Sequence, residues 1–348
     1  MNCTANKKKV LLALSGGVDS SVSVHLLKEQ GYDVEAIVLD FSPCHAAAVE
    51  AAKVSAELLG VKLHIHSCHK EFEENVITTF AKWYLEGKTP NPCIFCNPTT
   101  KFYFVLKKAE ELGFDHIATG HYANIEHNAK GHFLKKADFL PKDQSYMLYR
   151  LTQEQLSKLI FPLQGYSKDV IRQIATDIKL PCATAPDSQE ICFVKDGDYA
   201  AYIENHFGTS KIGKFISPDG KEICNHNGIL HYTVGQRKGL GISLGYPVFI
   251  KSIDKNSGDI YLGRKGEESR QEIFIEDCKF MPFDFIDKPF EATAKIRYSV
   301  NEIKCLVSPI NDKEAKISFL EKQNSATCPG QSCVIYNGDY VVGGGYIR

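Results

Sequence analysis

KVLLALSGGVDSS, residues 9–21, is the stretch that decides the fold of this chain. It joins an apolar run, residues 9–14, to an amphipathic segment, residues 20–30, through a turn that contains Gly16 and Gly17. Glycines let backbone amides approach an anion, and the start of a helix favours phosphate. The spacing and the lysine of a Walker A loop are missing. We therefore predict a strand, a phosphate-binding turn and a helix; an ordinary glycine-rich turn is the alternative.

Strand-like and helix-like segments alternate on both sides of this stretch. We expect strands over residues 9–14, 34–39, 62–67 and 116–119, and helices over 20–30, 46–59, 71–85, 100–112 and 151–180. Gly31 and Gly60 stand where the first two helices would end. Such alternation predicts βαβ units, and therefore an α/β fold with a parallel sheet covered by helices.

The composition and the pattern of apolar residues change from about residue 207. Gly and Pro become frequent, and short segments alternate apolar with polar residues, as in 249–262, 291–298 and 304–308. This pattern predicts an antiparallel barrel or sandwich. With 348 residues the chain is long enough for two or three domains. We expect a catalytic domain over 1–206, a small central domain over 207–268 and a C-terminal β-barrel over 269–348.

Composition narrows the class of protein. Hydrophobic residues make up 43% of the chain and charged residues 24%, which is ordinary for a globular protein. No apolar run approaches the roughly 20 residues of a membrane-spanning helix, and the N-terminus lacks a signal-peptide core. We therefore expect a cytoplasmic protein whose 12 cysteines serve catalysis, metals or packing. The net charge of −1 requires any contact with RNA to come from local patches.

Two segments carry cysteines in a chemically informative setting. TPNPCIFCN, residues 89–97, contains the pair Cys93 and Cys96, whose spacing suits a metal, a cluster or a redox disulfide. Two buried thiols in a loop are the plainer alternative. DSQEICF, residues 187–193, contains Cys192, and nothing local distinguishes this cysteine from Cys182.

Taken together, the motifs resemble those of the tRNA-specific 2-thiouridylases, which are PP-loop ATP pyrophosphatases. The blocks stand in the order found in that family, at residues 13–20, 89–97, 118–122, 142–146, 187–193, 232–241, 297–298 and 329–332. GMP, NAD and argininosuccinate synthetases share the PP loop but lack the later blocks. The resemblance spans nearly the whole chain.

The resemblance implies a transferase that adenylates the C2 carbonyl of the wobble uridine in tRNAs for Lys, Glu and Gln. Sulfur then replaces the oxygen, and AMP and pyrophosphate leave, with Mg²⁺ assisting. By matching motifs, ATP would be surrounded by Ala13, Leu14, Ser15, Gly16, Gly17, Val18, Asp19, Ser20, Leu39 and Gly120. The residues expected to contact tRNA are Asn91, Pro92, Cys93, His121, Lys142, Asp143, Gln144, Arg297, Tyr298 and Gln331.

The family's two essential cysteines fall on Cys96 and Cys192. In the two-cysteine scheme Cys192 carries a persulfide, and Cys96 releases the sulfur and closes a disulfide. Many family members have an aspartate at the position of Cys93. With a cysteine there, the resemblance implies that Cys93, Cys96 and Cys192 ligate a 4Fe–4S cluster with one open iron. The persulfide route, with Cys93 a bystander, is the alternative.

The chain departs from the family after the second strand. Residues 40–45 are short where relatives often carry a longer acidic insertion, which leaves the sulfur donor open between a cysteine desulfurase, a sulfur-relay protein and hydrosulfide. The segment and its surroundings hold Cys44, His45, Cys68 and His69, but no spacing supports one metal site. Two further functions stay open: a tRNA-binding PP-loop protein without thiolation activity, and a PP-loop ligase for a small molecule.

Overall fold

The computed structural model describes residues 7–186, 191–282 and 285–348. The chain divides into two compact units. The first consists of Met1–Val76, Cys93–Lys195 and Asp339–Val341, and the second of Ile77–Pro92, Asp196–Gly338 and Val342–Arg348. Among the described residues, no helix combines the length and the apolar character needed to cross a membrane.

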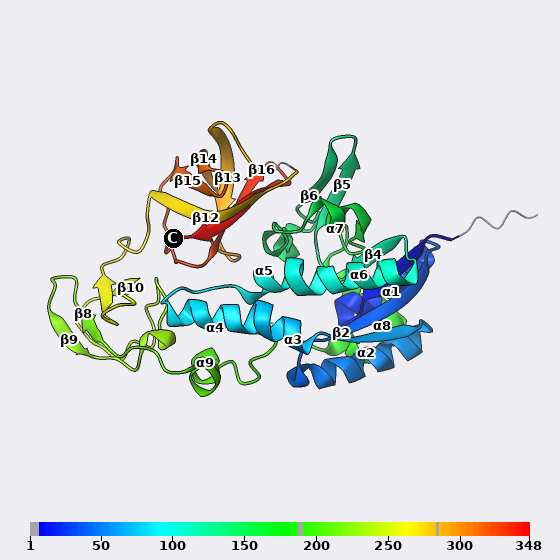
Figure 1. Cartoon of the computed structure of the whole chain (residues 1–348), viewed down its shortest axis with the longest axis horizontal. Helices are drawn as coiled ribbons and strands as arrows, with labels where there is room; N and C mark the ends of the chain where they lie inside the picture. Colours follow the sequence, from blue (N-terminus) through cyan, green and yellow to red (C-terminus); the bar gives the residue numbers. More distant parts are fainter. Residues whose placement is uncertain (1–6, 187–190, 283–284) are drawn as a thin grey trace, which may run out of the picture. The chain divides into compact units, whose positions relative to one another are not determined.

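A parallel sheet forms the centre of the first unit (Figure 1). Its strands lie in the order β3 (Leu63–Ser67), β2 (Asp33–Asp40), β1 (Lys9–Ala13), β4 (His116–Thr119) and β7 (Leu159–Ile160). Each neighbouring pair is parallel. The predicted α/β fold with a parallel sheet is therefore confirmed.

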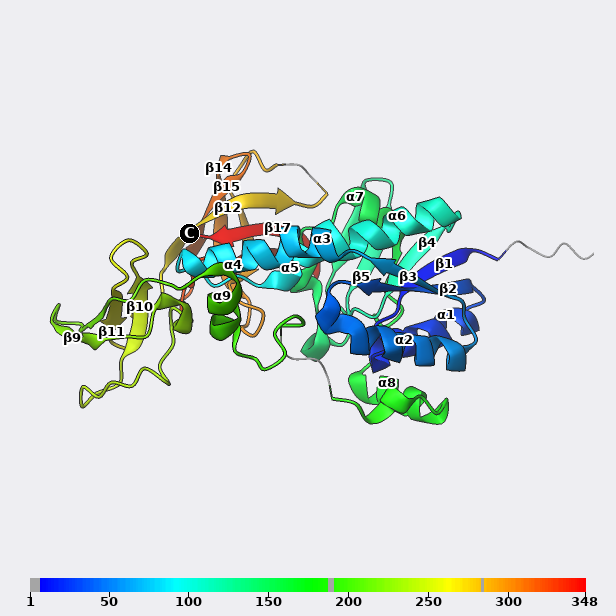
Figure 2. The same ribbon diagram turned by 60° about the horizontal axis from the view of Figure 1, so that its bottom comes forward.

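Helices cover both faces of this sheet. Figures 1 and 2 show α1 (Val18–Glu29) and α2 (Ala46–Leu59) on one face and α6 (Phe102–Leu112) on the other. On the first face, Val10 and Leu12 of β1 pack with Val24 of α1 and Ala52 of α2, and all four side chains are fully buried. This packing follows from the alternation of strand side chains and the 3.6-residue period of the helices.

The expected helix over residues 71–85 is interrupted. It consists of α3 (His69–Phe72), a π-helical turn over Glu73–Ile77 and α4 (Thr78–Leu85). Likewise α5 (Pro92–Cys96) runs into a second π-helical turn over Asn97–Lys101 before α6 begins. Such turns are rare and often occur at functional sites. The 3₁₀ turns cover Pro43–His45, Leu140–Lys142, Ser145–Met147, Pro181–Thr184 and Ile229–His231.

The helical prediction for residues 151–180 is wrong in part. The segment forms α7 (Gln153–Lys158), then β7, then α8 (Lys168–Asp177). Pro162 and Gly165 cannot continue a helix favourably, and Leu159 and Ile160 instead pair with β4 at the edge of the sheet. Thr152 and Ser167 start the two helices as N-caps. The hairpin of β5 (Asn124–Asn128) and β6 (Gly131–Lys135) was not predicted from the sequence.

The second unit contains a small mixed sheet after α9 (Tyr199–Phe207). Its order is β10 (Phe249–Ile253), β11 (Ile260–Gly263), β8 (Lys214–Ile216) and β9 (Glu222–Asn225). Strands β11 and β8 are parallel and the other two pairings are antiparallel. Its core is formed by Phe215, Ile250, Ile260 and Leu262.

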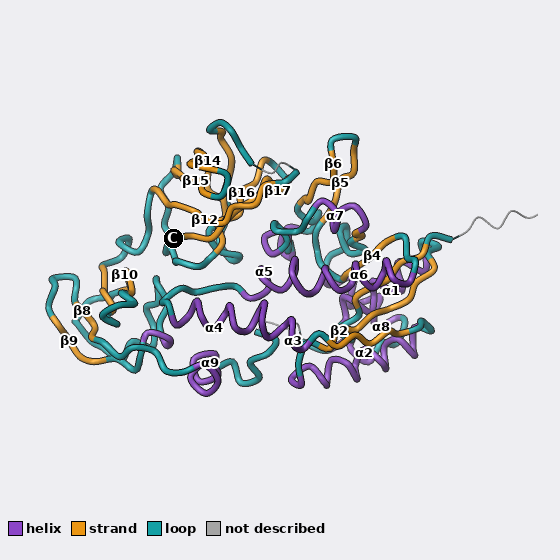
Figure 3. The backbone as a smooth tube through the Cα atoms, in the orientation of Figure 1, coloured by secondary structure: helices purple, strands orange, loops and turns teal. Residues whose placement is uncertain are grey.

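Six strands of the second unit close into an antiparallel barrel, joined by loops (Figure 3). They are β12 (Glu272–Phe280), β15 (Glu314–Phe319), β14 (Ile303–Asn311), β13 (Phe290–Lys295), β16 (Ser332–Asn337) and β17 (Tyr340–Ile347), with β17 paired back to β12. At this closure a Cβ on Gly343 would lie 2.2 Å from the Lys279 carbonyl oxygen. The predicted C-terminal β-barrel is confirmed.

We expect Leu12→Ala to destabilise the first unit by about 2–5 kcal/mol, because it leaves a cavity beneath the central strand. Leu12 is fully buried. Hydrogen exchange of the β1, β2 and β4 amides under native conditions measures this change. Val54→Ala is the control, since Val54 on α2 is 49% exposed and its truncation should change stability by less than about 0.5 kcal/mol. Equal effects of the two substitutions would contradict the proposed core.

Candidate active site

The glycine-containing turn lies at the carboxyl edge of the parallel sheet. Strands β1 and β4 are neighbours, with Ala13 opposite Thr119, and both chains leave the sheet at this edge. The order β3-β2-β1-β4-β7 places β2 on one side of β1 and β4 on the other. Open α/β sheets bind ligands at such a switch point, in the crevice outside the carboxyl ends of the strands. The residues expected to surround ATP come from these strand ends and from the first turn of α1.

Two glycines are required by close packing around this turn. Gly16 has φ +77, and a Cβ on it would lie 2.5 Å from the Cβ of Ala51 and 2.7 Å from the backbone nitrogen of Ala52 in α2. Gly120, which follows β4, approaches the start of α1, where a Cβ would lie 2.7 Å from the backbone nitrogen of Ser20. Any side chain at either position would push the turn away from its neighbours.

Hydroxyl groups hold the shape of the turn. The Ser15 backbone N–H donates to Ser20 Oγ over 3.2 Å, and Ser20 Oγ donates to the Gly17 carbonyl over 3.1 Å. Helix α1 has Gly17 at its N-cap position and no side-chain cap bond. The positive end of the helix is therefore not satisfied by a capping side chain, which suits an anion such as a phosphate.

Asp19 is held by two residues distant in sequence. Lys168 Nζ lies 2.8 Å from each of its carboxylate oxygens, and the Tyr122 hydroxyl donates to Oδ1 over 2.8 Å. Lys168 is 8% exposed at the start of α8, so this contact ties α8 to the first turn of α1. Lys168 was not predicted from the sequence, because a lysine in the first turn of a helix carries no distinctive signal.

The remaining residues expected to bind ATP form the floor of the turn. Leu14 and Leu39 are buried, and the Leu14 N–H donates to the Ile37 carbonyl over 2.8 Å. Val18 is also buried, in the first turn of α1. Most of the surface of these three side chains is buried, so their backbone atoms are the main groups of this set that can face a nucleotide.

The cysteines singled out by the sequence converge in the first unit. Cys93 and Cys96 lie on α5, and the charges of Cys93 and Cys192 each act on Cys96. The charge of Cys93 also acts on Cys192. Cys96 is buried, whereas Cys93 and Cys192 are exposed. Residues 187–190 of the Cys192 motif lie outside the described residues.

Both family cysteines have raised pKa values. Burial raises the pKa of Cys96 to about 12, and the positive charge of Lys101 opposes this shift. Desolvation followed by the charge of Cys93 raises the pKa of Cys192 to about 11, again opposed by Lys101. Although Cys192 keeps exposed surface, the protein around it disfavours its thiolate. Since the thiolate is the nucleophile, both sulfurs need activation at neutral pH.

Lys101 is a second residue that the sequence analysis missed. It ends the π-helical turn that follows Cys96, and its charge also acts on His121. The Asn97 side-chain amide donates to the Met147 carbonyl over 2.9 Å, and Gln155 Nε2 donates to the Pro98 carbonyl over 2.9 Å. These bonds fix the turn, which therefore holds a cation beside the thiols.

The expected cluster is not preformed. Within the described part of the chain, no group of three or more His, Cys, Asp or Glu side chains is arranged to hold a metal ion. No such group that includes Cys93, Cys96 or Cys192 is found among these described residues. His69, one of the cysteines and histidines without an assigned role, pairs with Asp40. The distance between His69 Nε2 and Asp40 Oδ2 is 2.8 Å.

Several residues expected to contact tRNA have internal partners in the first unit. Asp143 is buried and accepts bonds from the Ala137 N–H and from the Ser145 hydroxyl at 3.0 and 2.8 Å. Gln144 exchanges two bonds with the Tyr122 backbone, at 2.9 and 2.7 Å. These two residues shape the loops after β4. Of the two charged residues in the 142–146 motif, Asp143 is buried and Lys142 is half-buried.

His121 is half-buried between the rings of Phe102 and Phe161. Its Nδ1 lies 2.8 Å from the Thr119 hydroxyl. Desolvation, followed by the charge of Lys101, lowers its pKa well below 6.5. A neutral His121 can form a hydrogen bond with RNA, but it cannot pair with a phosphate as a cation.

In the second unit, Arg297 and Gln331 also have internal partners. Arg297 Nη2 donates to the Val234 carbonyl over 2.9 Å, and Gln331 Nε2 donates to the Thr89 carbonyl over 2.7 Å. Tyr298 is 39% exposed. Asn91 and Pro92 are half-buried at the end of the Ile77–Pro92 segment. Arg297 and Gln331 therefore position loops, and Tyr298 presents the larger exposed surface.

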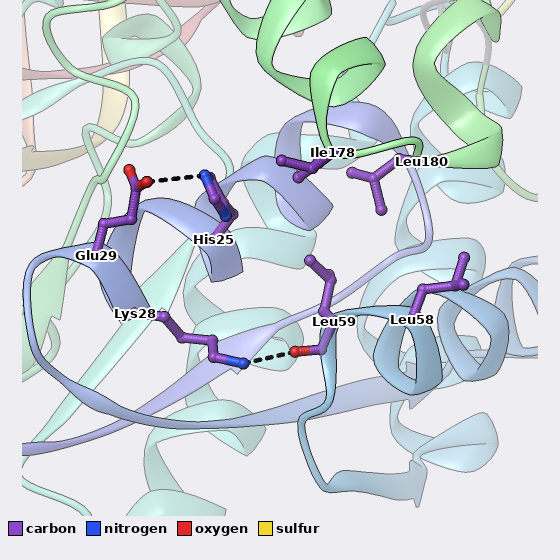
Figure 4. Close-up of a pocket in the computed structure, with 7 residues that line it drawn as sticks. All are labelled: His25, Lys28, Glu29, Leu58, Leu59, Ile178 and Leu180. Atoms are coloured by element: carbon purple, nitrogen blue, oxygen red, sulfur yellow. Dashed lines mark hydrogen bonds and ion pairs between the residues drawn. The ribbon is translucent and has the colours of Figure 1, made fainter.

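A cavity of about 370 Å³ lies away from the glycine turn, at the opposite end of α1 (Figure 4). His25 and Lys28 line it together with Leu58 and Ile178. Lys28 Nζ donates to the carbonyl of Leu59, the last residue of α2, over 2.6 Å. Because helix C-termini carry partial negative charge, this cavity suits phosphate less well than the carboxyl edge of the sheet.

We expect Lys101→Met to slow the alkylation of Cys192 by iodoacetamide at least about twofold at a fixed alkaline pH. Removing the cation raises the thiol pKa further, so the curve of rate against pH moves to higher pH. Peptide mass spectrometry between roughly pH 8 and pH 10 measures the shift. Lys107→Met, an exposed lysine on α6, is the control and should leave the curve in place. An unmoved curve for Lys101→Met would remove Lys101 from the thiol site.

Family descriptions match three successive parts of the chain. "tRNA methyl transferase HUP domain" matches residues 8–196, "tRNA methyl transferase PRC-barrel domain" matches 200–264, and "Aminomethyltransferase beta-barrel domain" matches 270–347. Among solved structures, a 4-thiouridine synthetase in complex with RNA and bound ATP is similar with a TM-score of 0.37 and 22% identity, over 51% of this chain and 43% of that one. That likeness is too remote to indicate function.

Two curated relatives are similar over nearly their whole length. The tRNA-specific 2-thiouridylase MnmA of Halothermothrix orenii is 44% identical, covering 98% of this chain and 99% of the relative. The protein of the same name from Caldicellulosiruptor saccharolyticus is 42% identical, with the same shares covered. The chain therefore belongs to the tRNA-specific 2-thiouridylase family.

Proposed function

We propose that this protein is a tRNA 2-thiouridylase, which uses ATP to replace the C2 oxygen of the wobble uridine with sulfur. The observation that carries the proposal is that the first unit holds both the glycine turn and the thiols of Cys96 and Cys192. Activation by ATP and transfer of sulfur require these two kinds of group. The curated relatives with 42–44% identity bear the name of this activity.

Activation precedes sulfur transfer because a uridine carbonyl oxygen is a poor leaving group. Attack of this oxygen on the α-phosphate of MgATP expels pyrophosphate and converts the oxygen into part of a good leaving group, AMP. The first turn of α1 and the backbone of Gly16 and Gly17 would stabilise the phosphates. Asp19, already bonded to Lys168 and Tyr122, fixes the position of this turn.

The two cysteines then transfer sulfur without loss of atoms or electrons. The outer sulfur of a Cys192 persulfide attacks C2, and AMP leaves with the former carbonyl oxygen. The Cys96 thiolate next attacks Cys192 Sγ, which breaks the bond to the transferred sulfur and leaves it on the base. A Cys96–Cys192 disulfide results, and an external thiol reductant restores both thiols. Lys101 favours the thiolate of each cysteine.

The narrower parts of the assignment rest on the family's pattern. We propose tRNAs for Lys, Glu and Gln as substrates and the cytoplasm as the compartment. The catalytic domain would cover residues 1–206, with the central domain over 207–268 and the barrel over 269–348 holding the tRNA. Lys142 and Tyr298 are proposed as direct contacts, and Asp143, Gln144, Arg297 and Gln331 as residues that shape the binding loops.

Nucleoside analysis of tRNA tests the function. A strain lacking this gene should lose 2-thiouridine, and the wild-type gene should restore it. The Asp19→Ala gene should restore none, because the substitution frees Lys168 and removes the link to the phosphate turn. The purified variant should release no AMP while still binding tRNA in a filter assay. Unchanged thiolation in the deletion strain would contradict the function, and ATP cleavage without RNA would favour a small-molecule ligase.

Cys93→Ala distinguishes the persulfide route from the cluster. Since no metal-ligand group that includes these cysteines is found among the residues that the structure describes, we expect this variant to keep most thiolation with a persulfide donor. Cys96→Ser and Cys192→Ser should each abolish it. Iron analysis after anaerobic reconstitution provides an independent measurement. Iron bound by the wild-type protein but not by Cys93→Ala, together with loss of thiolation in that variant, would establish the cluster instead.

A further inference from the structure

Cys44 lies at the same edge of the sheet as the glycine turn. It belongs to the short turn Pro43–His45, which follows β2, and β2 runs parallel to β1. The turn is held by the Ser42 hydroxyl, 2.9 Å from His45 Nδ1, and by the His45 N–H, which donates to the Ser42 carbonyl over 2.8 Å. The Cys44 side chain is half-buried, so part of it can be reached from solvent.

Aromatic side chains join this turn to the segment that carries Cys192. The rings of His45 and Phe72 are 5.6 Å apart, and those of Phe72 and Phe193 are 5.8 Å apart. Phe41 contacts both His45 and Phe72, with ring separations of 5.4 and 4.9 Å. The residues that directly follow Cys44 and Cys192 in sequence therefore pack on one shared ring.

Burial, followed by the charge of Cys93 and lastly by that of Cys44, raises the pKa of Cys192. Cys192 in turn interacts with Cys96, which is buried at 8% exposure. The exposed Cys192 and the half-buried Cys44 are accessible to an incoming molecule, whereas Cys96 is not. The shared Phe72 ring thus brings the turn of the half-buried Cys44 to the segment of the exposed Cys192.

We propose that Cys44 is the entry thiol for sulfur: it accepts the outer sulfur of an external persulfide and passes it to Cys192. The proposal rests on the 2-thiouridylase function. Cys44 attacks the outer sulfur of R–S–SH, forms Cys44–S–SH and releases R–SH. Cys192 then attacks the outer sulfur of Cys44–S–SH, forms Cys192–S–SH and restores the Cys44 thiol. Each S–S bond broken is replaced by another, so no oxidant or reductant is consumed.

Persulfide mapping on the full-length protein tests this order. Glutathione persulfide with an isotopically labelled outer sulfur is added without ATP or tRNA, and samples are alkylated over time and analysed by peptide mass spectrometry. Label should appear on Cys44 before Cys192. Cys44→Ser should load Cys192 about tenfold more slowly, because direct exchange replaces transfer between neighbouring thiols. Cys192→Ser should accumulate the label on Cys44.

Cys182→Ser is the matched control, since Cys182 is also half-buried in the first unit. It should load Cys192 at the wild-type rate, and thermal unfolding should confirm that each variant is folded. Equal loading in Cys44→Ser and wild type, or label on Cys192 before Cys44, would overturn the proposal. The mapping uses no tRNA. If the RNA substrate is wrongly assigned, thiolation of that tRNA fails but the order of labelling stays the same, so failure of the proposed function can be told apart from failure of the entry-thiol proposal.

Discussion

The geometry of the glycine turn depends on two close backbone contacts, one with α2 and one with the turn after β4. At Gly16 the chain contacts the backbone of α2, and at Gly120 it contacts the backbone of Ser20. Neither contact leaves space for a Cβ. The start of α1 is consequently held against the carboxyl ends of β1 and β4, where its partial positive charge can face a phosphate. The proposed nucleotide site depends on this packing more than on any single charged side chain.

A second constraint is electrostatic. Asp19 occupies the first turn of α1, and Lys168 and Tyr122 bind its carboxylate from two other parts of the chain. Removing one partner of such a pair leaves a charge in a largely buried place, at a cost on the order of a few kcal/mol. The ion pair therefore couples α8 and the loop after β4 to the phosphate turn. Tyr122 also exchanges backbone bonds with Gln144, which extends this coupling to the 142–146 motif.

Cys96 and Cys192 differ in solvent exposure, but the pKa values of both thiols are raised. Cys96 is buried and Cys192 is surrounded enough to raise its pKa, so both sulfurs are mostly protonated at neutral pH. Protonated thiols are protected from unwanted oxidation, which follows thiolate character and exposure. Lys101 opposes the shift at both cysteines from one position on a π-helical turn. Activation of sulfur can thus depend on a cation that the fold holds in place.

The sequence alone determined the elements whose signal is local. The apolar run of β1, the two glycines and the amphipathic α1 predicted the phosphate turn, and the alternation of strands and helices predicted the parallel sheet. The order of the motifs identified the family's cysteines, Cys96 and Cys192. Local signals failed at β7 and in the β5–β6 hairpin, because a two-residue strand exists only through pairing with its neighbour and the hairpin is short and half polar.

Tertiary structure alone decided which side chains meet. Lys168 and Asp19 are far apart in sequence, as are the segments of Cys44 and Cys192 that pack on the Phe72 ring, and no spacing along the chain could reveal either contact. The same holds for Asp143, Gln144, Arg297 and Gln331, which the family motifs placed among the RNA contacts and whose side chains bind the protein's own backbone or hydroxyls. The physical reason is that periodicity and turn chemistry report on neighbours along the chain, whereas burial, ion pairing and the pKa of a thiol depend on neighbours in space.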